Sequence, residues 1–152
     1  MIEIVNGIDY IDEIKTLIIE YTKFLNRDLS FQNLEEELND LKHKYTGNNG
    51  KVLVALVNGK VAGCVAYYKH NNNRCEMKRL FVKDEYKGLS IGNQLVKEIV
   101  EQARIAGYKE MVLDTIEPLK AAIHLYKKYG FIECNAYYDN PMNDVIYMKK
   151  DL

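Results

Sequence analysis

Hydrophobic and polar positions recur along this chain with two different periods, and these periods predict where helices and strands lie. Near the N-terminus, Ile2–Val5 has the pattern of a short strand. Asp9 can cap a helix that follows it. The apolar positions of that helix share one face: Ile11, Ile14, Leu17, Ile18, Tyr21 and Leu25. A second helix is expected from Phe31 to about Tyr45.

The middle of the chain has the pattern of an antiparallel sheet. Val52–Val57 and Val61–Tyr68 are apolar runs joined by Asn58-Gly59. This dipeptide between apolar runs is a strong hairpin signal, because both residues tolerate positive φ. A polar turn at His70–Asn73 then leads to Cys75–Val82. We therefore expect three consecutive antiparallel strands.

The last third of the chain mixes helices and strands. Apolar positions from Ile91 to Ala106 follow helical spacing, and Gly107 can end that helix. A strand is expected at Met111–Ile116, and Pro118 suits the first turn of a helix that Gly130 stops. Two closing strands are expected, at Phe131–Tyr138 and Val145–Lys149. This order predicts a mixed α/β sheet with a right-handed crossover through the helix that starts near Ile91.

Composition narrows the class of protein. The chain has 152 residues, of which 47% are hydrophobic, so we expect a single domain over residues 1–152. The formal charge is −1, from 21 basic and 22 acidic residues. This balance, without a long run of one sign, argues against nucleic-acid or membrane-surface binding. The N-terminus lacks the regions of a signal peptide, so we expect a cytoplasmic protein.

Cysteines and histidines add little chemistry to this picture. The three cysteines are spread out and odd in number, as expected for reduced, half-buried residues rather than a disulfide framework. The three histidines have no metal-ligand spacing with each other or with the cysteines. We expect no metal site.

Residues 80–95 are the most informative stretch. An apolar strand runs into a polar loop with Lys87, Gly88, Ser90 and Gly92, and an amphipathic helix follows. Small residues at such a turn let backbone N–H groups approach an anion, and the helix N-terminus adds partial positive charge. The stretch therefore predicts a pyrophosphate site. Its spacing fits neither a Walker A loop nor the Gly-x-Gly-x-x-Gly dinucleotide fingerprint.

Three segments together resemble the GNAT superfamily, which transfers acyl groups from coenzyme A. Lys87–Gly92 resembles the family's Arg/Gln-x-x-Gly-x-Gly/Ala loop, with Lys87 in place of Arg or Gln and Ser90 in place of the first Gly. Lys still supplies a cation, and the Ser hydroxyl can cap the helix. Cys75–Val82 resembles the family's fourth strand, and residues 122–131 resemble its Ala-x-x-Leu-Tyr-x-x-x-Gly-Phe signature. Leu119 stands where the family commonly has Asn.

The resemblance implies a fold, a cofactor and a reaction. The fold would be one domain of the α/β (α+β) class, with a mixed, mostly antiparallel sheet of six to seven strands and about four flanking helices. The cofactor would be acetyl-CoA (coenzyme A). The reaction would be acetyl transfer to a primary amine of a small molecule or peptide, by direct transfer in a ternary complex. The enzyme would be a monomer or a homodimer.

Two side chains are implied to be catalytic. Tyr126 matches the family tyrosine that hydrogen-bonds the coenzyme A sulfur and can protonate it; the alternative is a core tyrosine on the inner face of the helix. Glu76 lies eleven residues before Lys87, the offset of a strand glutamate that serves as base in some members. It could take the amine proton directly or through water. The alternative is a solvent-facing strand glutamate paired with a lysine.

The resemblance also implies binding residues. Backbone groups of Leu80, Phe81 and Val82 would hold the pantetheine arm and polarise the thioester carbonyl. The pyrophosphate would be held by the loop, which comprises Lys87, Gly88, Leu89, Ser90, Ile91 and Gly92. Candidates on the acceptor side are Tyr21, Arg79 and Tyr138. Arg79 could clamp a substrate carboxylate, or it could pair with a carboxylate of the protein itself.

Two other functional classes stay open from the sequence. One is a non-catalytic acyl-CoA-binding regulatory module on the same fold, which the departures at Ser90 and Leu119 allow. The other is an unrelated α/β nucleotide binder that uses the loop for ATP or NAD.

Overall fold

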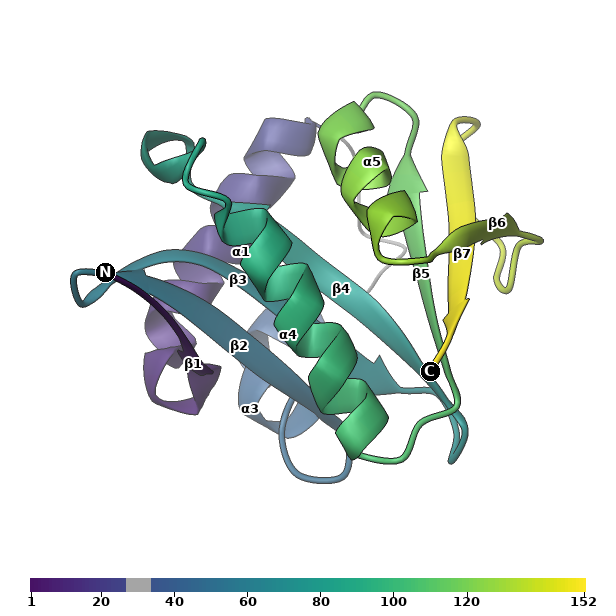
Figure 1. Ribbon diagram of the computed structural model, residues 1–152, viewed down its shortest axis with the longest axis horizontal. Coiled ribbons are helices and arrows are strands. Elements are labelled where there is room, and N and C mark those ends of the chain that lie inside the picture. The colour runs from purple at the N-terminus through teal and green to yellow at the C-terminus, as the bar shows by residue number, and fades with distance from the viewer. Residues whose placement is uncertain (27–33) are drawn as a thin grey trace.

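The computed structural model describes residues 1–26 and 34–152. Seven strands of these residues form one sheet with the order β1-β2-β3-β4-β5-β7-β6 (Figure 1). The strands are β1 (Ile2–Asn6), β2 (Gly50–Val57), β3 (Lys60–Lys69), β4 (Arg74–Val82), β5 (Glu110–Ile116), β6 (Ile132–Cys134) and β7 (Val145–Asp151). β4 and β5 pair in parallel and every other neighbouring pair is antiparallel. The prediction of a mixed, mostly antiparallel sheet is confirmed.

Helices cover both faces of the sheet. The described α-helices are α1 (Ile11–Leu25), α2 (Leu34–Asn39), α3 (Leu41–Lys44), α4 (Ile91–Ile105) and α5 (Lys120–Lys128). α4 and α5 lie on one face and α1 on the other (Figure 1). None of the helices in the described residues has the length and apolar character needed to cross a bilayer.

Successive side chains of the strands point to opposite faces of the sheet, so the protein has two hydrophobic cores, one on each face. On β2, Leu53 and Ala55 pack in the cluster under α4, whereas Val52 and Val54 pack in the cluster under α1. Successive side chains of a strand point to opposite faces, so a central strand with helices on both sides is apolar throughout. This is why Val52–Val57 has no polar position in the sequence.

The predicted turns are confirmed at the backbone. Asn58 and Gly59 have φ of 50° and 83°, as a tight hairpin turn requires. Gly107 and Gly130 have φ of 97° and 92° just beyond the ends of α4 and α5. Left-handed glycine is a common way to end a helix, since it has no Cβ to clash.

Two predictions near the N-terminus are wrong. Asp9 caps no α-helix, because Gly7–Tyr10 forms a 3₁₀ turn first, and the Asn6 side chain accepts a hydrogen bond from the Ile8 N–H at 2.9 Å. The second predicted helix is split into α2 and α3, since Asp40 has non-helical angles of −144° and 49°. The first part of that prediction, residues 31–33, lies outside the described residues.

Two further boundaries differ from the predictions. α5 begins at Lys120 rather than in a turn that includes Pro118. The strand predicted to run to Tyr138 ends at Cys134. Beyond Cys134 the chain leaves the sheet edge, and the rings of Tyr137 and Tyr138 pack on Tyr147 at centroid distances of 5.2 and 5.7 Å. Packing of these aromatic rings replaces strand pairing in this segment.

Candidate active site

The candidate site lies where β4 and β5 separate. The two strands pair only between Arg74–Glu76 and Glu110–Val112, and then diverge (Figure 1). From Met77 onward β4 keeps its pairing with β3, and β5 pairs with β7 along its whole length but no longer with β4. One edge of β4 is thus without a strand partner among the described residues. An extended ligand can add to such an edge as a further strand.

A β-bulge in β4 changes which side chains face each core. Arg79 has φ of 62°, and the pairing shifts between Cys64 and Ala66 of β3, so β4 carries one extra residue there. Met77 before the bulge and Leu80 after it both pack in the cluster under α4. Lys78 and Arg79 therefore project on the opposite face, together with Glu76.

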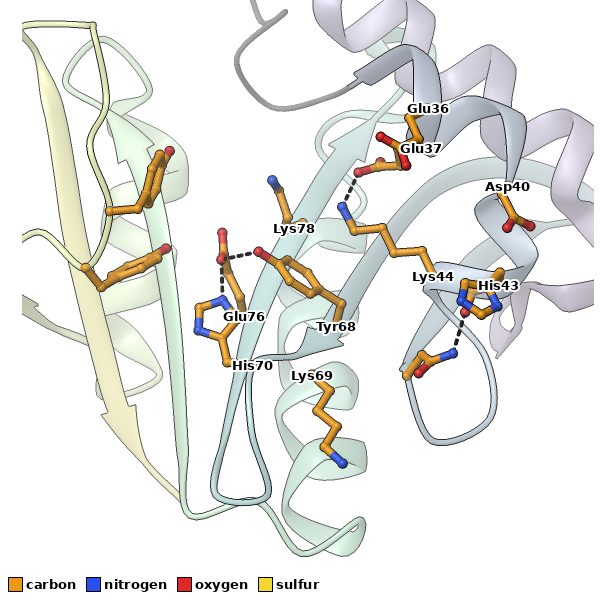
Figure 2. A pocket seen from close by; sticks show the side chains of 13 residues that line it. Glu36, Glu37, Asp40, His43, Lys44, Tyr68, Lys69, His70, Glu76 and Lys78 are labelled. Carbon is orange, nitrogen blue, oxygen red and sulfur yellow. Dashed lines mark hydrogen bonds and ion pairs between the residues drawn. The ribbon is translucent and has the colours of Figure 1, made fainter.

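The larger of two cavities beside β4 lies on that opposite face. It has a volume of about 680 Å³ and is framed by α2, α3, the facing ends of β3 and β4, and the segment with Tyr137 and Tyr138 (Figure 2). Its lining is rich in charged and aromatic side chains, including Glu37, Lys44, Tyr68, His70, Glu76 and Lys78. A cavity of this size and polarity can hold a small polar acceptor.

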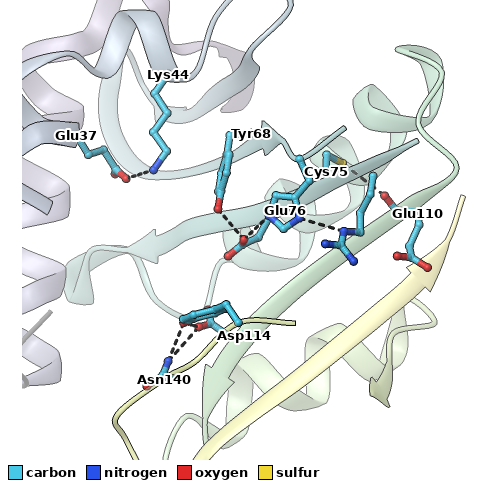
Figure 3. Close-up of polar contacts among 11 residues, drawn as sticks. Glu37, Lys44, Tyr68, Cys75, Glu76, Glu110, Asp114 and Asn140 are labelled. Carbon is cyan, nitrogen blue, oxygen red and sulfur yellow. Dashed lines mark hydrogen bonds and ion pairs between the residues drawn. The ribbon is translucent and has the colours of Figure 1, made fainter. Parts of the chain in front are cut away.

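Glu76 lies deep in this cavity with 3% of its side chain exposed. The Tyr68 hydroxyl and His70 Nε2 both donate to its Oε1, at 2.8 and 2.7 Å (Figure 3). Burial would raise the pKa of Glu76, but the His70 hydrogen bond, the Lys78 charge and the Tyr68 hydrogen bond outweigh it and lower the pKa. Glu76 is therefore a carboxylate at neutral pH, and it does not face solvent.

A hydrogen bond from Arg74 determines which ring nitrogen of His70 carries the proton. The Arg74 Nε–H donates to His70 Nδ1 at 3.0 Å. Because guanidinium groups only donate, Nδ1 must carry a lone pair, and the ring proton of neutral His70 sits on Nε2. His70 is thus held as the tautomer that donates to Glu76. Arg74, His70 and Glu76 form a chain of hydrogen bonds that fixes the carboxylate.

Tyr126 of α5 borders the smaller cavity, which has a volume of about 60 Å³. Tyr21, Leu80 and Asp114 line the same space. Tyr126 is 7% exposed and also packs in the core cluster with Phe131. Burial, with the nearby Tyr21 and Asp114, raises the pKa of Tyr126. The phenol therefore keeps its proton at physiological pH, as a proton donor must.

Asp114 lies between the two cavities. It lines the smaller one and accepts a hydrogen bond from the Tyr138 hydroxyl, whose ring lines the larger one (Figure 3). Asn140 Nδ2 donates to the same hydroxyl at 2.7 Å. Burial raises the pKa of Asp114, and the Tyr138 hydrogen bond opposes that rise. Tyr138 is positioned as a wall of the site by these two bonds.

Arg79 already has a protein partner. Its guanidinium donates to both carboxylate oxygens of Glu37 in α2, at 2.8 and 3.2 Å, and 7% of the residue is exposed. Of the two alternatives that the sequence left open for Arg79, the structure shows the pairing with a carboxylate of the protein itself. Of the three acceptor-side candidates, Tyr21 and Arg79 line the smaller cavity and Tyr138 the larger.

The glycine loop has the geometry of an anion site. Gly88 and Ser90 have φ of 89° and 61°, and no atom lies within 4 Å of where a Cβ on Gly88 would stand. Gln94 N–H bonds the Ser90 carbonyl at 3.1 Å, so the N–H groups of residues 91–93 have no acceptor within α4. Lys87 is exposed and pairs with Asp84 at 2.7 Å. The expected hydroxyl cap from Ser90 is wrong, since its side chain makes no cap hydrogen bond.

The sequence reasoning missed His70, Lys78 and Asp114. A signal for Lys78 existed, because residues two apart on a strand share a face, which places Lys78 beside Glu76. His70 and Asp114 had none, since their positions depend on which strands pair. Within the described residues, no group of three or more His, Cys, Asp or Glu side chains is placed to hold a metal ion.

Comparison with known proteins identifies the family of this chain. Residues 16–131 match the family model described as the acetyltransferase (GNAT) family. An uncharacterized N-acetyltransferase of Schizosaccharomyces pombe is 42% identical over 144 residues, which cover 93% of this chain and 88% of that protein.

Solved structures share the fold. The crystal structure of a GNAT-family acetyltransferase from Staphylococcus aureus has a TM-score of 0.82, with 22% identity and 99% of each chain covered. A GNAT-family acetyltransferase from Elizabethkingia anophelis, crystallised with acetyl-CoA bound, has a TM-score of 0.61 and 25% identity, over 74% of this chain and 82% of that one. The family match spans most of the chain, and we conclude that the chain belongs to the GNAT family of acetyltransferases, which use acetyl-CoA.

Proposed function

We propose that this protein transfers the acetyl group of acetyl-CoA directly to a primary amine of a small molecule or peptide bound in the larger cavity. One observation carries the proposal. The two cavities meet at Lys78, with the Glu76 carboxylate in one and the Tyr126 phenol in the other. A proton acceptor and a proton donor thus flank the unpaired edge of β4.

The residues present fit the cofactor. The backbone of Leu80, Phe81 and Val82 lies on the part of β4 that β5 leaves unpaired, so its free groups can pair with an extended pantetheine arm. The unpaired N–H groups at the start of α4, with the left-handed backbone at Gly88 and Ser90, suit the pyrophosphate. Lys87 adds a positive charge at the same loop.

When bound, acetyl-CoA supplies an acyl group activated as a thioester. Two side chains of this protein would move the protons of the transfer. Glu76 would accept the proton that the amine loses as its nitrogen bonds the acyl carbon, directly or through one water. Tyr126 would donate its proton to the sulfur as the carbon–sulfur bond breaks. Holding both reactants between the two cavities adds the advantage of proximity.

The test removes only the Tyr126 hydroxyl. We expect Tyr126→Phe to lower kcat about 100-fold, because the leaving sulfur loses its proton donor, while the Kd for acetyl-CoA changes little. Tyr129→Phe is the matched control, since Tyr129 also lies at the end of α5 but bonds Asn93 at 2.8 Å and lines neither cavity. Thiol release with a panel of amines measures turnover, and calorimetry measures binding.

Two outcomes would count against the proposal. Unchanged kcat in Tyr126→Phe would remove Tyr126 from the mechanism. Tight acetyl-CoA binding by the natural protein, with no thiol release from any amine of a broad panel, would instead favour a non-catalytic acyl-CoA-binding module.

A further inference from the structure

Lys78 is a partly buried cation, and within the residues that the structure describes it has no anionic partner. It is the residue that lines both cavities, and its ammonium extends between the Glu76 carboxylate and the Glu37–Lys44 pair (Figure 2). Within residues 1–26 and 34–152 its side chain makes no hydrogen bond or salt bridge; its one ring contact is Tyr68, at 5.8 Å from the centroid. Tyr68 supplies a π face but no counter-charge.

The buried carboxylates around Lys78 are already paired. Glu37 holds Arg79 at 2.8 Å and Lys44 at 2.6 Å. Glu76 accepts from Tyr68 and His70, and Asp114 accepts from Tyr138. The other carboxylates of the larger cavity, Glu36 and Asp40, are exposed on α2 and in the turn after it.

Leaving the Lys78 ammonium unpaired costs free energy. A buried charge is tolerated when it is paired or hydrogen-bonded, and is otherwise unfavourable. Burial, with the neighbouring Arg79 charge, lowers the pKa of Lys78 accordingly. An anionic group that entered the cavity beside Lys78 would recover part of this cost, so the site is better matched to an anionic ligand than to a neutral one.

We propose that the amine acceptor carries a carboxylate, which pairs with Lys78 while the amine lies beside Glu76. This inference rests on the proposed function and names its substrate class: amino acids and similar small molecules with both groups. Residues two apart on one strand face are separated by about 7 Å. An ammonium and a carboxylate a few bonds apart can meet Glu76 and Lys78 across that distance, each at ion-pair length.

The first test compares acceptors that differ in one group. Amino acids and their carboxamides would be assayed in pairs, over side chains of several sizes. We expect the natural protein to prefer the acid in kcat/KM by about 30-fold or more, because the amide leaves Lys78 unpaired. In Lys78→Met this ratio should fall toward one. Lys60→Met is the control, since Lys60 is exposed at the β2–β3 hairpin and lines neither cavity.

A second measurement does not depend on turnover. Calorimetric titration of the same acids and amides into the protein saturated with coenzyme A reports acceptor binding alone. The acids should bind more tightly than the amides to the natural protein, and Lys78→Arg should keep more of that preference than Lys78→Gln. Thermal unfolding of each variant shows that it is folded.

The outcomes separate the two proposals. Turnover of amides equal to that of acids, or an acid preference that survives in Lys78→Met, would overturn the carboxylate assignment and leave the transferase proposal standing. Carboxylate-selective binding without turnover would support the assignment of Lys78 and contradict the transferase proposal. Failure of every acid in the panel to bind the natural protein would overturn the assignment of Lys78.

Discussion

At the scale of single residues, the chemistry of the site depends on neighbours that are distant in sequence. The hydrogen bonds from Tyr68 and His70 help to keep Glu76 ionised, because burial alone would raise its pKa. The carboxylate is instead ionised and fixed in direction by two donors. Arg74 in turn sets the tautomer of His70. His70 is therefore a positioning residue for the proposed base.

The first prediction concerns His70→Ala. Loss of the His70 donor removes an interaction that favours the charged form of Glu76, so the pKa of Glu76 rises. The acid limb of the pH profile of kcat/KM should move to higher pH, and kcat/KM on that limb should fall about tenfold, as expected for one hydrogen bond to a charged group. Steady-state kinetics across the pH range checks this.

Two variants sharpen the result. His70→Gln keeps an N–H donor and should restore part of the natural profile. His124→Ala removes an exposed histidine on α5 and should leave the profile as it is. An acid limb that stays in place in His70→Ala would show that Glu76 does not set it.

Single-sequence reasoning proposed Glu76 and Tyr126 because each lies in a segment with a recognisable pattern. It could not find the proton arrangement at Glu76. That arrangement depends on the β3–β4 turn bringing His70 and Arg74 together, and on Tyr68 pairing with Glu76 across the two strands. The sequence carries no local signal for such contacts.

At the scale of elements, the bulge in β4 is the feature that the sequence concealed. A left-handed backbone is usual for Gly or Asn, whereas here Arg79 and Ser90 adopt it. Strict alternation through Cys75–Val82 would place Lys78 and Leu80 on the same face. The extra residue separates them, and it aims Arg79 at α2, where it meets Glu37.

The second prediction concerns the ion pair between Glu37 of α2 and Arg79 of β4. Burial would raise the pKa of Glu37, but the charges and hydrogen bonds of Arg79 and Lys44 lower it from 4.5 to about 2. A carboxyl group with a lowered pKa in the folded state stabilises the fold above its unfolded pKa, and that contribution is lost as pH falls. This lowering of the Glu37 pKa corresponds to about 3 kcal/mol of stability, present above about pH 4.5 and lost on the way to pH 2.

Glu37→Gln should therefore lower the free energy of unfolding by about 3 kcal/mol at pH 7, because the buried Arg79 guanidinium loses its interaction with the Glu37 charge. The loss should shrink as pH falls below 4.5. Urea unfolding at pH 7 and pH 3 measures both effects. Glu36→Gln, at an exposed position on the same helix, should stay within about 0.5 kcal/mol of the natural protein. A pH-independent loss in Glu37→Gln would contradict the ionic origin of the effect.

At the scale of the whole molecule, the order of elements was predictable and the space of the candidate site was not. Hydrophobic periods located the seven strands, and the Asn58-Gly59 hairpin fixed the first pairing. The gap that creates the site arises because β4 and β5 pair over only three residues of each strand. No period in the sequence records where two strands stop pairing, since that depends on the twist of the complete sheet and on the helices that cover it.

Because β4 and β5 pair over only three residues of each strand, a ligand that fills the gap between them would add contacts to the folded state. The third prediction is therefore that acetyl-CoA stabilises the whole fold. A ligand that binds the native state alone adds about 2.7 kcal/mol at 100 times its Kd. For a domain of 152 residues this corresponds to a rise in Tm of about 5 to 10 °C. Lys87→Glu should reduce the rise by placing a negative charge beside the proposed pyrophosphate site, whereas Lys109→Glu, at an exposed position beyond the opposite end of α4, should not. ATP and NAD at the same concentration should shift Tm much less, because neither offers a pantetheine arm to the free edge of β4. Equal shifts with all three ligands would mean that the loop binds phosphates generally and would favour an unrelated nucleotide-binding role for this site.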